Sequence, residues 1–126
     1  MITITQDFLI FGVKACNDAM LAFSRAPGVT DADTWLFTIG SSSNQRSTIQ
    51  KTGSAEQSFA TPDVLSCDSM RMFWIDFSDN VSIGKGEAIG VNAIGSVSTT
   101  DRENYNSLAL ATDNSVHGQW TLLTES

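Results

Sequence analysis

The sequence predicts an all-β fold, an antiparallel β-sandwich of the jelly-roll type formed by a single domain over residues 1–126. Short runs of β-branched and aromatic residues recur about every 8–12 residues, and turns rich in Gly, Asn, Asp and Ser separate them. A length of 126 residues fits one domain. No internal repeat is visible, which argues against a propeller or a trefoil.

The first two expected strands lie on either side of a polar pair, Asn17 and Asp18. Apolar and polar residues alternate over residues 11–16, the pattern of a half-buried strand, and a second apolar run covers residues 19–24. This arrangement predicts a hairpin or one long bulged strand. A helix over residues 15–23 is the alternative because Ala, Met and Leu favour helices, but the residues just upstream favour a sheet.

The remaining strands follow from similar signals. Residues 34–40 form a strand that ends in Gly, and residues 46–52 form a strand with Ile49 pointing inward. Residues 59–65 indicate two short extended pieces around a turn at Pro62-Asp63. The rest of the chain is expected to contain a hairpin and four further extended segments, at residues 70–77 with 81–84, then 88–91, 94–97, 105–111 and 116–123.

The charge balance excludes two classes of partner. Fourteen acidic side chains against 7 basic ones leave a net charge of −7. Nucleic acids and anionic membrane surfaces both require clustered Lys and Arg, so we expect neither as a partner. No run approaches the roughly 20 apolar residues of a membrane span, so membrane insertion is not expected.

Catalytic motifs are also missing from the sequence. Residues 84–87 resemble a fragment of a phosphate loop but lack its full spacing, and no Rossmann fingerprint is present, so no cofactor is expected. His117 is the single histidine, and no G-x-S-x-G motif accompanies it. We therefore expect a protein that is not an enzyme.

Metal binding has little support. One histidine and two distant cysteines cannot form a usual zinc site. Calcium could use Asp31 with Asp33, or Asp76 with Asp79 and Asn80, but neither group follows EF-hand order, and turn-forming acids are the favoured interpretation. No metal is therefore expected.

Two interpretations of the cysteines stay open. Cys16 and Cys67 form one bridge in an oxidising compartment, or they are two small buried hydrophobic residues, which is the favoured interpretation. The N-terminus has no basic region followed by a long apolar run, so no signal peptide is visible. The chain is therefore either cytoplasmic or the mature form of a secreted protein.

A binding module is the class that remains. Trp35, Trp74, Trp120 and Tyr105 carry flat rings that can stack on a sugar, and polar loop residues can bond its hydroxyls. Within an apolar strand, a residue such as Trp74 is more often part of a core than a binding platform. Tyr105 and His117 have polar neighbours and are expected to be accessible.

Several segments resemble the farnesoic acid O-methyltransferase-like domain. Residues 73–77, the turn at Asp79-Asn80 and residues 81–86 resemble its central motif. Further matches cover nearly the whole chain, at residues 11–19, Ile39-Gly40, Asn44, residues 46–49 and residues 118–120. The aromatic residue that is usual in the family at the end of the stretch over residues 94–101 is absent, since Ser98 and Thr99 lie there, which puts ligand contacts in that region in doubt.

This resemblance implies an extracellular recognition role, because similar modules occur in secreted animal proteins and small invertebrate lectins. We expect a secreted, non-enzymatic lectin that binds glycans or glycoproteins, with a galactose-containing glycan as the finer expectation, and that forms a homodimer or tetramer. The alternatives are a structural or protein-binding adhesion module without sugar affinity, and an enzyme acting on an isoprenoid acid. The expected sugar contacts are loop residues with suitable donors and acceptors: Asn44, Arg46, Lys85, Glu87, Asp101, Arg102, Tyr105 and His117.

Overall fold

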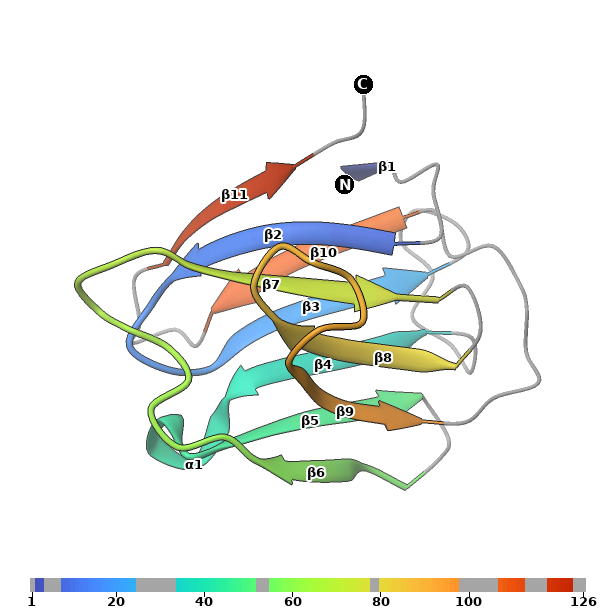
Figure 1. Ribbon diagram of the computed structural model, residues 1–126, viewed down its shortest axis with the longest axis horizontal. Coiled ribbons are helices and arrows are strands. Elements are labelled where there is room, and N and C mark those ends of the chain that lie inside the picture. The colour runs from blue at the N-terminus through green and yellow to red at the C-terminus, as the bar shows by residue number, and fades with distance from the viewer. Residues whose placement is uncertain are drawn as a thin grey trace.

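Two antiparallel β-sheets face each other in the computed structural model (Figure 1), which describes residues 2–3, 8–24, 34–51, 55–77, 80–97, 107–112 and 118–123. Sheet A has six strands in the order β1 (Ile2–Thr3), β10 (Ser107–Thr112), β3 (Ala19–Ser24), β4 (Trp35–Gly40), β5 (Arg46–Lys51) and β6 (Gln57–Ala60). Sheet B has five strands in the order β11 (Gln119–Leu123), β2 (Phe8–Lys14), β7 (Arg71–Asp76), β8 (Val81–Lys85) and β9 (Ala93–Val97). The predicted antiparallel sandwich is confirmed.

The chain changes sheets several times. It passes from β2 in sheet B to β3 in sheet A, continues through β4, β5 and β6, and returns to sheet B for β7, β8 and β9. Strand β10 then pairs with β3, and β11 pairs with β2. The β2–β3 and β10–β11 segments therefore run alongside each other across both sheets, as in a jelly roll.

The hairpin or bulged strand predicted across Asn17 and Asp18 is wrong, and so is the alternative helix. Strands β2 and β3 lie in different sheets and do not pair. The Asp18 backbone takes a left-handed conformation, with φ 53°, and its N–H donates to the carbonyl of Gly40 over 3.0 Å. Alternating burial is the same whether two strands are neighbours in one sheet or face each other across a core, so the pattern could not separate these arrangements.

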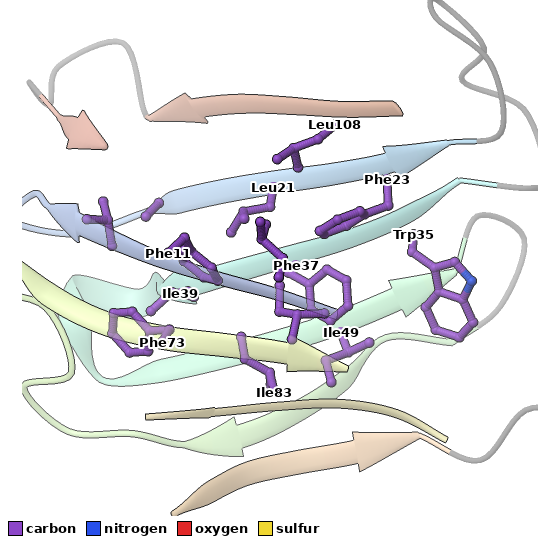
Figure 2. Close-up of a cluster of buried hydrophobic side chains, with 14 of the residues drawn as sticks. Phe11, Leu21, Phe23, Trp35, Phe37, Ile39, Ile49, Phe73, Ile83 and Leu108 are labelled. Atoms are coloured by element: carbon purple, nitrogen blue, oxygen red, sulfur yellow. The ribbon is translucent and has the colours of Figure 1, made fainter. Parts of the chain in front are cut away.

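The core consists of the inward-facing residues of both sheets. Phe11 and Phe73 stack with their ring centroids 5.7 Å apart, and Phe23 meets Phe37 edge to face at 5.5 Å. Figure 2 shows these rings between the sheets, together with Ile49, which is 1% exposed. The inward orientation of Ile49 predicted from the sequence is thus confirmed.

The second half of the chain confirms one prediction and corrects another. Strands β7 and β8 form the expected hairpin, with Ile75 opposite Ile83. The extended piece expected at residues 88–91 is instead a tight turn, in which the N–H of Val91 donates to the carbonyl of Ala88 over 3.1 Å. The connection between β8 and β9 crosses in front of β7 (Figure 1).

Cys16 and Cys67 form a disulfide, so the favoured interpretation of two buried thiols is wrong. Both residues are exposed. Cys16 follows β2 and Cys67 precedes β7, and these two strands are neighbours in sheet B. The N–H of Ala15 donates to the carbonyl of Ser66 over 3.1 Å, which holds the two connections together next to the bridge. Because the pairing depends on contacts between distant strands, the spacing of the cysteines could not reveal it.

In the part of the chain that the structure describes, no helix has the length and apolar character needed to cross a membrane.

Candidate functional site

A hollow of about 400 Å³ lies at one edge of the sandwich, where β6 of sheet A and β9 of sheet B are the outermost strands. The Phe59 ring lies so close to Gly95 that a Cβ there would be 2.4 Å from it, which shows that the two edges are in contact beside the hollow. Residues from both sheets line the hollow: Ala60, Thr61, Pro62, Lys85, Asn92, Ala93 and Ile94.

The wall from sheet A consists of Ala60, the last residue of β6, and of Thr61 and Pro62, which follow it directly. The N–H of Thr61 donates to the carbonyl of Gln45 over 2.9 Å, and the N–H of Asp63 donates to the carbonyl of Asn44 over 2.9 Å. The buried hydroxyls of Ser47 and Thr61 are 2.8 Å apart and share a hydrogen bond. Three hydrogen bonds thus fix this wall against the start of β5, so it is held in place without a ligand.

The Asn44 side chain secures the next part of the same segment. Its Nδ2 donates to the carbonyl of Leu65 over 2.8 Å, and its Oδ1 accepts from the N–H of Leu65 over 2.9 Å. The side-chain amide thus exchanges two hydrogen bonds with the Leu65 backbone, as paired residues of neighbouring antiparallel strands do, although the two residues are 21 positions apart. Both polar atoms of the amide are therefore already bonded to the protein.

The wall from sheet B consists of the end of β8, the last residue of the connection to β9 and the start of β9, and its lining residues are Lys85, Asn92, Ala93 and Ile94. The N–H of Lys85 donates to the carbonyl of Asn92 over 3.0 Å, which closes the base of this loop. Gly86 has φ 94°, a conformation that favours glycine, and its N–H donates to the carbonyl of Met72 over 2.8 Å. These bonds bring Asn92 beside Lys85.

Trp74 holds the outer part of the same loop. Its side chain is 2% exposed, yet it points to the outer face of sheet B, since its neighbours Phe73 and Ile75 face the core. The indole lies over Gly84, where a Cβ would be 2.3 Å from the ring, and its Nε1 donates to the carbonyl of Val91 over 2.8 Å. Trp74 therefore anchors the loop and is not available for stacking on a sugar.

The groups around the hollow differ in chemistry. Val81 and Ile83 face the core, and Lys85, two positions further along β8, is exposed and lines the hollow. Asn92 adds a carboxamide, and Pro62 and Ile94 add apolar surface. The site can therefore offer hydrogen-bond donors, one cationic group and apolar contact to a ligand of mixed polarity.

The structure brings one of the eight predicted contact residues to the hollow, namely Lys85. Glu87 is exposed in the adjoining loop and does not line the hollow. Asn44 lies behind the wall, and the Nε of Arg46 donates to the hydroxyl of Ser58 over 2.7 Å on the outer side of sheet A. The other four lie outside the described residues: Asp101, Arg102, Tyr105 and His117.

Sequence reasoning missed Thr61, Pro62 and Asn92. The sequence indicates Pro62 only as a turn residue. The extended segment predicted over residues 88–91 gives no reason to expect Asn92 at a binding site. Of the other aromatic candidates, Trp35 is 2% exposed, and Trp120 packs on the core with its ring 6.1 Å from that of Phe11. Among the described residues, no group of three or more His, Cys, Asp or Glu could hold a metal ion.

Comparison with known proteins gives one match. The family model described as farnesoic acid O-methyl transferase matches residues 3–125. The chain belongs to this family. In this farnesoic acid O-methyl transferase family member, the match includes both walls of the hollow and both cysteines. No curated protein and no solved structure matches the chain.

Proposed function

We propose that this protein is a non-enzymatic lectin and that the hollow between β6 and β9 binds the sugar. The observation that carries the proposal is a preformed hollow of about 400 Å³ whose lining combines polar and apolar residues. Small-molecule sites commonly have volumes of about 300–1,000 Å³ and combine apolar walls with a few polar groups.

The chemistry of the walls suits a sugar ring. Pro62 and Ile94 offer apolar surface to the C–H groups of the ring, while Asn92 and Lys85 offer donors to its hydroxyls. The carboxamide of Asn92 is also an acceptor, so it can bond to a hydroxyl in either direction. A galactose-containing glycan is the finer part of this proposal.

Secretion and self-association belong to the same proposal. The disulfide between Cys16 and Cys67 supports an extracellular location, because disulfides form and persist mainly in oxidising compartments. A single sugar site is shallow and weak, so a homodimer or tetramer would bind clustered glycans much more tightly through avidity.

A glycan array with the full chain tests the proposal. We expect binding to a defined set of glycans, and we expect Asn92→Gly to reduce it at least about tenfold, since a polar group that bonds a sugar hydroxyl is lost. Glycine is the appropriate replacement because Asn92 has φ 57°. Gln57→Ala is the matched control, since Gln57 is an exposed amide at the far end of β6.

The alternative is an adhesion module without sugar affinity. If no glycan on the array binds, and no free sugar at millimolar concentration shifts the amide resonances, the lectin proposal is wrong. Binding of S-adenosylmethionine measured by calorimetry would instead favour the enzyme that the family name describes.

A further inference from the structure

This inference rests on the proposed function and concerns the class of sugar. We propose that the hollow prefers a sugar that carries a carboxylate or a sulfate group, and that Lys85 is the residue that sets this preference. Lys85 is the charged residue among those that line the hollow.

The position of Lys85 favours this role. Lys85 is exposed at the end of β8, and it lines the hollow together with Thr61 and Pro62, which follow the last strand of the other sheet. An anionic group between the two walls would therefore meet the ammonium group at the edge of the sandwich. At this edge, protein rather than water lies on one side of the ion pair, which strengthens the attraction between the anionic group and the ammonium group relative to open solvent.

The local charge differs from that of the whole molecule. The chain carries a net charge of −7, so its general field repels anions. Asp63 and Glu87 are the acidic residues nearest in sequence to the walls; both are exposed, and neither lines the hollow. A cationic hollow on an acidic protein is a place where an anionic ligand is favoured over the surrounding surface.

The amide of Asn92 complements this charge. The Lys85–Asn92 backbone bond places the two side chains at the base of the same loop. Lysine supplies only donors, whereas asparagine supplies both donors and an acceptor. A sugar with one anionic group and neighbouring hydroxyls can therefore use the cation and the amide together, while a neutral sugar can bond to the ammonium only through its hydroxyls.

The experiment compares every sialylated or sulfated glycan on the array with its unmodified parent. We expect the anionic member to bind about tenfold more tightly at low salt, and the ratio to fall as salt screens the interaction. Lys85→Gln should bring the ratio close to one, and Lys85→Arg should preserve it. Lys14→Gln, at the end of β2, is the matched control and should leave the ratio unchanged.

The outcomes separate the two proposals. Sialyllactose and sulfated lactose, each measured against lactose by calorimetry, distinguish a carboxylate preference from a sulfate preference. Equal binding of parent and anionic glycans, or a preference that persists in Lys85→Gln, overturns this inference and leaves the lectin proposal intact. Absence of binding to any glycan, neutral or anionic, overturns both.

Discussion

At Gly84, the absence of a side chain leaves room for the indole that anchors the connection between β8 and β9. The indole of Trp74 occupies the space where a Cβ of residue 84 would lie, with ring atoms at 2.3 Å from that point. The same indole donates to the carbonyl of Val91, so the absence of a side chain at residue 84 allows the loop to be anchored over sheet B. The position of Asn92 in the hollow depends on that anchor.

We expect Gly84→Ala to lower the free energy of unfolding by about 2–3 kcal/mol, because the indole must move and loses its bond to Val91. Thermal unfolding and tryptophan fluorescence measure the two effects. Gly90→Ala is the control in the same loop: it has open space around its Cβ and φ 86°, so it should cost about 1 kcal/mol and leave the fluorescence unchanged. Equal effects from both variants would contradict this account.

Asn44 shows where residue-level prediction from sequence fails. The sequence marks it as a polar turn residue and a sugar contact, but its amide is bonded to Leu65, a buried residue 21 positions later. That partner depends on how the two sheets are connected, which no local pattern contains. Lys85, by contrast, stands at the end of a recognisable strand, and its location beside a turn could be predicted.

Replacing Asn44 by glycine should lower the free energy of unfolding by about 2–4 kcal/mol, because two groups of the buried Leu65 backbone lose their partners. Glycine keeps the φ of 67° available, so the loss reports on the hydrogen bonds. Asn44→Asp, which keeps only the acceptor, should lie between glycine and wild type in chemical denaturation. A glycine variant as stable as wild type would show that these bonds contribute nothing.

At the scale of elements, the disulfide joins the connection that follows β2 to the connection that precedes β7, next to the pairing of these two strands. Cys16 and Cys67 are separated by 51 positions, so the bridge restricts a long segment of the unfolded chain. We expect Cys16→Ser with Cys67→Ser to lower the free energy of unfolding by about 2–4 kcal/mol, measured by urea denaturation. The walls of the hollow are held by their own hydrogen bonds, so sugar binding should survive in the folded variant. Loss of binding at temperatures where it remains folded would contradict this.

An element can be predicted from the sequence when the residues that determine its structure lie close together along the chain. The β7–β8 hairpin could be predicted because two apolar runs and a turn lie within a short stretch. The separation of β2 from β3 could not, since burial alternates in the same way in both arrangements. The connection between β8 and β9 was misread because its apolar residues suit a strand, whereas a tight turn and the bond to Trp74 determine its shape.

At the scale of the whole molecule, the location of the hollow restricts how copies can associate. Strands β6 and β9 flank the hollow, so pairing through those edges would obstruct it. Strand β11 is the opposite edge of sheet B, and its residues Gln119–Leu123 carry no charge that would oppose pairing with another strand. A dimer that leaves the hollows of both copies open is therefore expected to form through β11.

We expect light scattering after size-exclusion chromatography to give a dimer or tetramer, and Thr121→Lys to shift it toward monomer, because an edge-strand charge opposes pairing. Thr121 is exposed on β11. The matched control is Ser96→Lys on the exposed surface of β9, which should leave the assembly intact. A monomer at every protein concentration would refute self-association, and equal effects of both lysines would refute the role of β11.

The division of the hollow between two sheets has a mechanical consequence. The edges of a sandwich are among the first parts to open locally, and opening the β6–β9 edge separates the two walls. A ligand that contacts both walls binds only the closed edge, so its binding free energy opposes fraying. At a ligand concentration 100 times its Kd, this linkage amounts to about 2.7 kcal/mol. The bound sugar would hold the two sheets together at this edge, and an edge that can fray would be strengthened by its ligand.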